Sequence, residues 1–184
     1  MGADSRAVAS QLNNVRSISA TSSAFAALKS DGSVITWGNG NGGGINDRAS
    51  GTNGADSGGS PAVADALRSG VVKIVAAGGA FAALKANGSV VSWGSGINGV
   101  TGLYERLQAV RVSKIVANAG AFAAFTTSGA VITWGSSETG GDSAAVASQL
   151  SSDVVDIVAN DAAFSAIKAD GTVVTWGRAD SGGN

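Results

Sequence analysis

Three groups of residues could support chemistry by their types and spacing, and the first is a set of glycines. Gly38, Gly40 and Gly43 have the Gly-x-Gly-x-x-Gly spacing of loops that cradle phosphate groups at the start of a helix. No helix pattern begins directly behind them, and the segment is crowded with glycine and asparagine. The spacing therefore favours a surface loop over a nucleotide site.

The second group consists of Asp-Ser pairs, whose carboxylates could surround a cation. They occupy residues 4–5, 56–57, 142–143 and 180–181. A calcium loop needs several acids at alternate positions, and no segment has that pattern. Because Asp and Ser side chains also accept hydrogen bonds from the free amides at the start of a helix, helix capping is the favoured interpretation.

The four tryptophans form the third group, and an exposed ring of them could stack ligands or absorb light. Each stands at the same position of a repeated pattern, which favours packing in a core. Histidine and cysteine are both absent, so the commonest general base and the thiolate metal ligands are missing. An enzyme would have to rely on carboxylates, and replacing Asp142 and Asp161 should then abolish turnover. We predict no catalytic, cofactor-binding or metal-binding residues, and no cofactor.

Composition and charge argue against several classes of partner. The 184 residues carry 12 basic and 13 acidic side chains, so no net field attracts nucleic acid or an anionic membrane. No run of about 18 apolar residues could span a bilayer. The first twenty residues lack the basic start and the apolar centre of a secretion signal. We therefore expect a soluble protein that binds no nucleic acid and does not span a membrane.

A pattern of isoleucine, phenylalanine and tryptophan occurs four times along the chain. Phenylalanine lies seven residues after isoleucine and twelve residues before tryptophan in each copy: Ile18-Phe25-Trp37, Ile74-Phe81-Trp93, Ile115-Phe122-Trp134 and Ile157-Phe164-Trp176. The tryptophans are 56, 41 and 42 residues apart, so the unit has about forty residues and the first interval carries an insertion. We expect a single repeat domain over residues 1–184, with units at about 1–38, 60–94, 102–135 and 142–177 and a glycine-rich loop insertion at 39–59.

Each unit has the pattern of a short helix followed by three strands. In the second unit, residues 71–76 and 80–85 have the β-branched or apolar character of strands. Asn87-Gly88, like Asp31-Gly32 and Asp170-Gly171, is typical of a type I′ hairpin turn, so the second and third strands should be antiparallel neighbours. Amphipathic spacing and capping residues predict short helices at 5–12, 61–67, 103–108 and 143–150.

The strands predict burial on both faces of each sheet. Residues 24–28 read Ala-Phe-Ala-Ala-Leu, without the alternation of a sheet that has one solvated face. A propeller blade lies between two neighbouring blades, where alanine lets backbones approach closely and phenylalanine fills the wider gaps. The twelve residues of the Ile-Phe-Trp triplets are therefore the predicted structural core, each contributing about 1.5–3 kcal/mol on burial. A single unit alone should not fold.

The strand portion of all four units resembles the repeat of the RCC1 superfamily. The resemblance is clearest at residues 80–85 (AFAALK) and 87–94 (NGSVVSWG), and its closest form is the shorter repeat of β-lactamase inhibitory protein II. It extends to both ends of the chain through the equivalent positions Lys29, Gly32, Val34, Trp37, Gly38, Lys168, Gly171, Val173, Trp176 and Gly177. The resemblance implies a mainly β fold, an RCC1-like β-propeller of four αβββ repeats, with three-stranded antiparallel blades and short connecting helices.

The resemblance covers a wide range of functions. Members of the superfamily serve as a nucleotide exchange factor for a small GTPase, as protein inhibitors, as ligase targeting domains and as a plant ultraviolet receptor, all on a seven-bladed ring. This chain has four units, and helices replace the usual Gly-Gln-Leu-Gly connector. The four units could close as a four-bladed ring within one chain, or between two chains as a dimer of eight units.

The favoured function is a non-catalytic protein-binding or structural scaffold. Loops differ between units while strands do not, and a scaffold places its specificity in such loops. The candidate partner-binding residues are Ile45, Asn46, Ile97, Val100 and Tyr104, in or beside the loops at 39–60 and 95–102. An alternative is a small peripheral subunit of a larger complex, for example an organellar or photosynthetic one. The expected partner is therefore a protein. The chain itself is expected to be a monomer, a homodimer or a subunit of a larger assembly.

Overall fold

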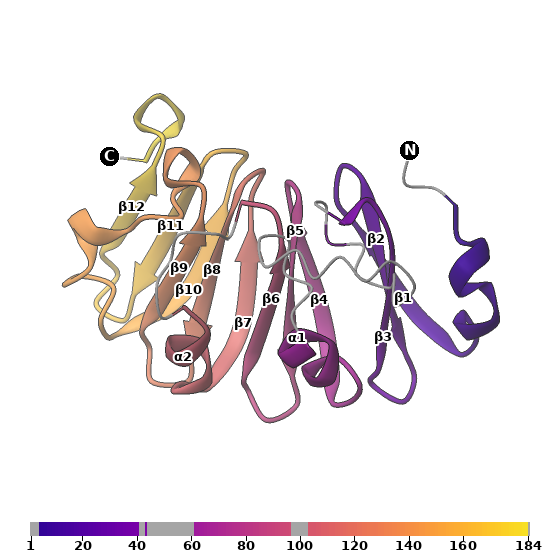
Figure 1. Cartoon of the computed structure of the whole chain (residues 1–184). Helices are drawn as coiled ribbons and strands as arrows, with labels where there is room; N and C mark the ends of the chain where they lie inside the picture. The colour runs from indigo at the N-terminus through magenta and orange to yellow at the C-terminus, as the bar shows by residue number, and fades with distance from the viewer. Residues whose placement is uncertain (1–3, 41–42, 44–60, 97–102, 184) are drawn as a thin grey trace. The chain divides into compact units, whose positions relative to one another are not determined.

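The computed structural model describes residues 4–40, 43, 61–96 and 103–183 (Figure 1). The chain divides into two compact units, Met1–Asn98 and Gly99–Asn184. Each unit holds two three-stranded antiparallel sheets, and each sheet consists of three strands consecutive in sequence. The described part of the chain is therefore mainly β, with one sheet for each sequence repeat.

The first unit contains the first and second sheets. A 3₁₀ helix, η1 (Arg6–Gln11), precedes the first sheet, which consists of β1 (Val15–Ala20), β2 (Ala24–Lys29) and β3 (Val34–Gly38). The α-helix α1 (Pro61–Ala66) leads into the second sheet, which consists of β4 (Val71–Ala77), β5 (Ala80–Lys85) and β6 (Val90–Gly94).

The second unit contains the third and fourth sheets. The α-helix α2 (Leu103–Gln108) precedes the third sheet, which consists of β7 (Val112–Ala117), β8 (Ala121–Thr126) and β9 (Val131–Gly135). Two 3₁₀ helices, η3 (Ser137–Thr139) and η4 (Ala144–Val146), lead to the fourth sheet, which consists of β10 (Val154–Ala159), β11 (Ala163–Lys168) and β12 (Val173–Gly177). A last 3₁₀ helix, η5 (Ala179–Ser181), follows.

The four sheets share one register, which places each Ile-Phe-Trp triplet on a single face. In the second sheet Phe81 lies directly opposite Trp93, and Ile74 lies opposite Ala83. Side chains two residues apart on a strand share a face, so all four point the same way. We call this the aromatic face. The opposite side of each sheet is the alanine face, which in the first sheet carries Ala24, Ala26, Leu28 and Val34.

The hairpin between the second and third strands is antiparallel as predicted, but the predicted turn type is wrong. In the first sheet the Gly32 amide donates to the Lys29 carbonyl, and the Lys29 amide donates to the Ser33 carbonyl. Only glycine has a positive φ in this turn, +78° at Gly32, whereas a type I′ turn needs positive φ at both central residues. The turn is a three-residue loop with a glycine bulge. The Asp31 carboxylate favours it by accepting hydrogen bonds from the amide and the hydroxyl of Ser33.

Two of the four predicted helices are α-helices and two are 3₁₀ helices. In α1 the Leu67 amide donates to the Val63 carbonyl, four residues back. In η1 the Val8 amide donates instead to the Ser5 carbonyl, three residues back, and η4 begins in the same way with Val146 and Ser143. Serine competes for backbone hydrogen bonds and weakens longer α-helices, which is consistent with the tighter turns in these two segments. Among the described residues, no helix is both long and apolar enough to cross a membrane.

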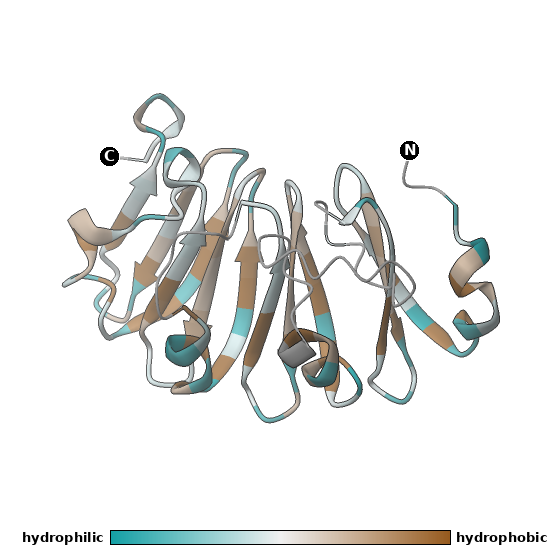
Figure 2. Cartoon of the chain, viewed as in Figure 1, coloured by the Kyte–Doolittle hydropathy of each residue, from teal (hydrophilic) through white to brown (hydrophobic). Residues whose placement is uncertain are grey.

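In the first unit, the alanine face of the first sheet packs against the aromatic face of the second. Strand β4 contacts both β1 and β2. The shared core joins Ala24, Ala26, Leu28 and Val34 of the first sheet to the second sheet's Ile74, Phe81, Ala83, Val91 and Trp93. The strands are largely hydrophobic and the hairpin turns more polar, as Figure 2 shows. This core is therefore an interface between two sheets.

The second unit repeats the same packing. Strand β10 contacts both β7 and β8. The core joins Ala121 and Ala123 of the third sheet's alanine face to the fourth sheet's aromatic face, with Ile157, Phe164, Ala166, Val174 and Trp176. The same interface therefore occurs in both units. In each, the alanine face of the earlier sheet packs against the aromatic face of the later sheet.

One of the twelve predicted core residues is exposed. Ile18 is 58% exposed, whereas its counterpart Ile74 is only 8% exposed. The structure contradicts the prediction here because Ile18 lies on the aromatic face of the first sheet, which faces away from the interface with the second sheet. Phe25 and Trp37 on that face are half-buried. The other nine triplet residues, in the three later sheets, are all buried.

Candidate functional site

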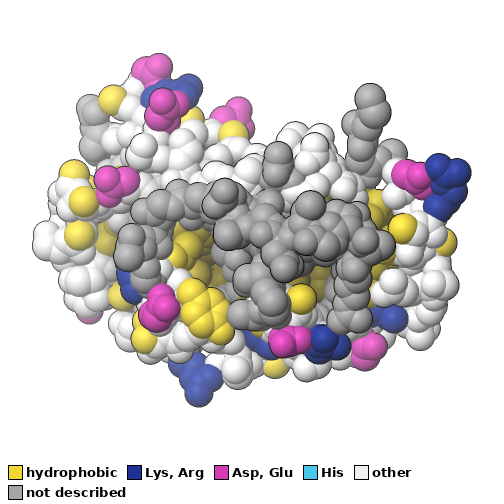
Figure 3. All heavy atoms as spheres, in the orientation of Figure 1, with side chains coloured by type: hydrophobic (Ala, Val, Ile, Leu, Met, Phe, Trp, Pro, Cys, Tyr) yellow, Lys and Arg dark blue, Asp and Glu magenta, His cyan; other side chains and the backbone are white. Residues whose placement is uncertain are grey.

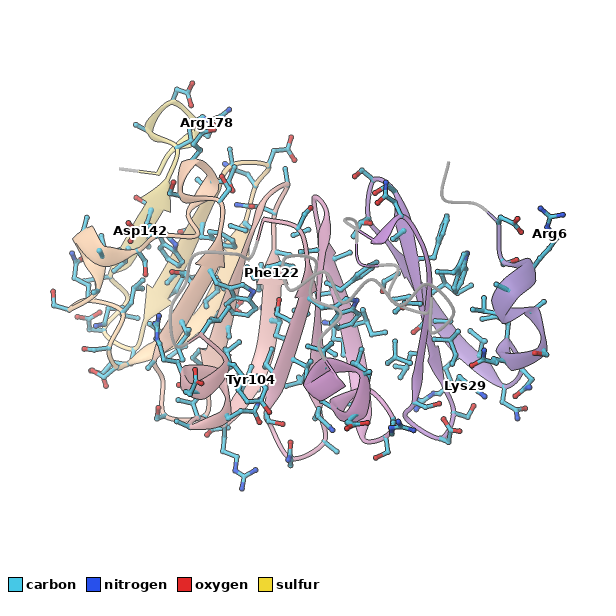
Figure 4. All side chains as sticks on the ribbon, in the orientation of Figure 1. Arg6, Lys29, Tyr104, Phe122, Asp142 and Arg178 are labelled. Carbon is cyan, nitrogen blue, oxygen red and sulfur yellow. The ribbon has the colours of Figure 1, made fainter. Side chains whose placement is uncertain are left out.

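Each sheet carries one stacked Phe–Trp pair on its aromatic face. The ring centroids lie 5.1–5.4 Å apart and the ring planes are within 15–26° of parallel. The pairs of the second, third and fourth sheets are at most 3% exposed, and Figure 4 labels Phe122 in the third sheet. Their burial favours a packing role over ligand stacking or light absorption.

A glycine carbonyl satisfies the indole N–H of two of the buried tryptophans. Trp93 Nε1 donates to the carbonyl of Gly43 at 3.1 Å, and Trp176 Nε1 donates to the carbonyl of Gly140 at 3.0 Å. Gly43 follows the first sheet and Trp93 is in the second, while Gly140 follows the third sheet and Trp176 is in the fourth. A Cβ on Gly140 would lie 2.8 Å from the Phe164 ring, so a larger residue would displace the aromatic pair.

Gly43 is also the last glycine of the Gly-x-Gly-x-x-Gly spacing noted in the sequence, and the structure gives that spacing a local role. The Gly43 amide donates to the Gly40 carbonyl, which closes a turn, and Gly38 has a φ of +114° next to the backbone of Ala24. The sequence reading missed the role of Gly43 as an indole acceptor. A signal was present, because Gly43, Gly140 and Gly182 each follow a tryptophan by six residues.

The Asp-Ser pairs that the structure describes have helix-capping or local roles. Asp4 accepts a hydrogen bond from the Arg6 amide, and Asp142 accepts one from the Ala144 amide. The aspartates, not the serines, provide these caps, because neither Ser5 nor Ser143 makes a side-chain cap. No group of three or more Asp, Glu, His or Cys side chains in the described ranges could hold a metal ion.

The carboxylates with shifted pKa values are bound to nearby donors and not to one another. The side chain of Lys114 hydrogen-bonds Asp156 at 2.6 Å and, together with the Ile157 amide, lowers the pKa of that carboxyl. Hydrogen bonds from the hydroxyl and amide of Thr172 lower the pKa of Asp170. These shifts favour charged, structural carboxylates. A general acid would need a raised pKa instead.

The two acids considered for catalysis have separate environments. Asp142 caps η4 and is exposed, and Figure 4 labels it. Asp161 is also exposed, and its backbone carbonyl accepts a hydrogen bond from the Ala119 amide across the third and fourth sheets.

Tyr104 is the one predicted partner-binding residue within the described part of the chain. It is 51% exposed on α2, which is anchored by the buried side chains of Leu103 and Leu107, and Figure 4 shows it projecting from the helix. The equivalent position of α1 is Ala64, which directly follows Val63, the first of a similar pair of buried anchors, Val63 and Leu67. The other candidates, Ile45, Asn46, Ile97 and Val100, lie outside the described residues.

Surface charges on the described residues are mixed in sign. The ion pairs Arg6–Asp4, Arg68–Asp65 and Lys114–Asp156 each join opposite charges within 2.8 Å. On the face drawn in Figure 3, basic and acidic side chains are intermixed and no large patch of one sign is present. This distribution does not favour a polyanion.

Comparisons with known proteins place the fold. No protein-family model matches the sequence, and no curated protein does. Among solved structures, Prp20p of Saccharomyces cerevisiae matches with a TM-score of 0.60 and 16% identity, over 93% of this chain and 46% of that one. Human WBSCR16 matches with a TM-score of 0.59 and 17% identity, over 89% of this chain and 47% of that one.

A further match is yeast RCC1 (Prp20) in its complex with Kap60, with a TM-score of 0.57 and 16% identity, over 91% of this chain and 44% of that one. The chain thus spans less than half the length of these structures. The fold is an RCC1-like β-propeller fold with four three-stranded blades, as the repeats predict. The structures of yeast Prp20 concern binding to proteins, since they include Kap60 and describe binding to Gsp1p and histones.

Proposed function

We propose that this chain is a non-catalytic protein-binding scaffold whose four repeats act as one domain over residues 1–184. The supporting observation is that the four sheets are alike, whereas the helices that connect them differ. The four sheets share their register and aromatic pairs, while α2 carries an exposed tyrosine that its counterpart α1 lacks. A rigid repeat with a variable connector is the arrangement that protein-binding repeat domains use.

Tyr104 is the residue best suited to contact a partner. It is the chain's single tyrosine, and aromatic side chains held on a rigid element are enriched in protein interfaces. Its neighbours on the helix, Glu105 and Arg106, are exposed and carry opposite charges. An aromatic anchor surrounded by charges of both signs fits a folded protein partner better than a nucleic acid.

Two finer forms of this proposal follow from the same surface. The likeness of the repeats to the short repeats of β-lactamase inhibitory protein II suggests a stoichiometric binder of another folded protein. A peripheral subunit of a larger assembly would use the same residues in a permanent contact. The two differ in whether the partner co-purifies at a fixed ratio through extended washing.

The test compares capture of proteins from the native source by immobilised wild-type chain, Tyr104→Ser and Val72→Ser. Val72 is a matched control because it is exposed to a similar extent, 50%, but lies on a strand and not on a connector. A specific partner should bind wild type and Val72→Ser alike and bind Tyr104→Ser about tenfold or more weakly. If every retained protein binds the three chains equally, Tyr104 is not the anchor. If none is retained specifically, the scaffold proposal fails.

A further inference from the structure

The first and last sheets each have one face with exposed apolar side chains. At most of the equivalent positions inside the chain, the side chains are buried between two sheets. On the aromatic face of the first sheet, Ile18 is 58% exposed. On the alanine face of the fourth sheet, Val158, Ile167 and Val173 are 54%, 43% and 59% exposed. These are large apolar side chains, and together they account for most of the exposed large hydrophobic residues in the described part of the chain.

The two exposed faces have the two patterns that bind each other inside the chain. Ile167 and Val173 occupy the positions of Leu28 and Val34, which are 3% and 8% exposed against the aromatic face of the second sheet. Ile18 occupies the position of Ile74 on the other side of that interface. An aromatic face and an alanine face are therefore both partly exposed, and they have the two patterns that pack against each other inside the chain.

The loop after the fourth sheet is already built to accept an indole N–H. Gly182 has a φ of +87° and the same local hydrogen bonds as Gly140, which has a φ of +93° and accepts the Trp176 indole. A Cβ added to Gly140 would meet the Phe164 ring, whereas a Cβ on Gly182 would meet nothing within 4 Å. Gly182 thus offers an acceptor to an aromatic pair, and the half-buried Trp37 carries the matching donor.

Backbone groups at the two exposed faces also match. Inside the chain, the Val34 amide donates to the Leu67 carbonyl and the Val71 amide donates to the Gly32 carbonyl, across the first and second sheets. The second unit repeats both bonds with Val131 to Leu150 and Val154 to Gly129. In the fourth sheet the equivalent groups are the Val173 amide and the Gly171 carbonyl. At the first sheet they are the Val15 amide and the Leu12 carbonyl, although Leu12 lies three residues before Val15 and the other leucines lie four before their valines.

We infer that two copies of this chain bind head to tail, with the alanine face of the fourth sheet in one copy packed on the aromatic face of the first sheet in the other. Because each copy has one face of each kind, the contact is heterologous, and two such contacts close a pair when successive copies are related by a half turn. Trp37 of one copy then donates to the Gly182 carbonyl of the other. This inference does not depend on the proposed function.

The experiment measures mass in solution by analytical ultracentrifugation over a concentration series, for wild type and single variants. Ile18→Glu places a charge on the aromatic face, and Val173→Glu places one on the alanine face. Both residues are more than half exposed in the chain, so both variants should fold, which circular dichroism checks. Val155→Glu is the control, because Val155 is 53% exposed and its counterparts in the other three sheets, Arg16, Val72 and Ser113, are exposed as well.

Wild type and Val155→Glu should form a dimer, and each face variant should dissociate about 100-fold more readily. Mixing Ile18→Glu with Val173→Glu should restore a heterodimer, because that mixture has one intact face of each kind on different chains. A monomeric wild type at all concentrations would overturn the inference and point to closure within one chain or to further repeats as the occupant. A dimer that survives both substitutions, or an open polymer, would also overturn it.

Discussion

Replacing Phe81 with alanine should destabilise the first unit much more than replacing Phe25, its counterpart in the first sheet. Both phenylalanines stack on a tryptophan at nearly the same centroid distance, 5.2 Å for Phe81 and 5.3 Å for Phe25. Phe81 is 0% exposed because the alanine face of the first sheet covers it, whereas Phe25 is half-buried. The difference between the two variants therefore isolates the packing of one sheet on another.

The expected magnitudes follow from burial. Truncating a fully buried phenylalanine to alanine destabilises a protein by about 3–5 kcal/mol, because apolar contacts are lost and a cavity remains. For Phe25 we expect about 2 kcal/mol, because part of its ring already contacts water. With a urea m-value of about 2 kcal/mol per molar, the unfolding midpoints of the two variants should differ by about 1 M.

The assay is urea unfolding followed by far-UV circular dichroism, in the Val173→Glu background. We expect this substitution to weaken association between chains, and it leaves the first sheet unchanged. Both phenylalanines belong to the compact unit Met1–Asn98, so both variants perturb the same cooperative unit. Equal midpoints for Phe81→Ala and Phe25→Ala would refute the reasoning, since they would show that the second sheet's aromatic face is no better covered than the first sheet's.

Two further predictions concern the second unit. Gly140→Ala should lower its melting temperature more than Gly182→Ala, because both glycines have similar positive φ values but only at residue 140 would the new Cβ meet the Phe164 ring; a calorimetric scan showing equal losses would contradict this. Lys114→Gln should lower stability at neutral pH. The pKa of the Asp156 carboxyl is lower in the folded chain than in the unfolded chain. The ion pair with Lys114 therefore stabilises the folded chain fully above the unfolded-state pKa, and this stabilisation is lost as the pH falls through the folded-state pKa. Urea midpoints of wild type and variant should therefore converge at low pH, and a constant difference down to pH 2 would rule out this origin.

The repeat made the architecture accessible from sequence. A fixed Ile-Phe-Trp spacing could occur four times only if each copy used the same register, and Phe81 does lie opposite Trp93 as Phe164 lies opposite Trp176. Apolar character on both strand faces correctly indicated sheets stacked face to face. The antiparallel hairpins followed from the Asp-Gly and Asn-Gly pairs, whose chemistry restricts the local backbone.

Two predictions from the sequence were wrong, the type of the hairpin turn and the burial of Ile18. Asp31-Gly32 fits both a type I′ turn and a glycine-bulge loop, and the hydrogen bonds from Ser33 to the Asp31 carboxylate favour the second. Ile18 has the same place in the repeat as Ile74. Its burial, however, depends on which sheet covers its face, and among the described residues no sheet lies before the first. Repetition alone cannot distinguish the first copy of a pattern from an internal one.

The candidate site was less accessible because its contacts join distant segments. The bond from Trp93 to Gly43 spans fifty residues, and only the six-residue Trp-to-Gly spacing hints at it. Tyr104 was predicted from its place beside a variable loop, and the structure adds that the buried side chains of Leu103 and Leu107 anchor it. A side chain's exposure on a short helix depends on such anchors and on their partners across the fold.

Exchange of the tryptophan indole protons with D₂O, followed by NMR in the Val173→Glu background, tests most directly whether the repeats stack aromatic face against alanine face. The indole N–H groups of Trp93 and Trp176 are buried and bonded to glycine carbonyls. Trp37 is half-buried, on the aromatic face of the first sheet that does not pack against the second sheet. We predict slow exchange at Trp93 and Trp176 and fast exchange at Trp37. Exchange at Trp93 and Trp176 as fast as at Trp37 would contradict the stacked arrangement.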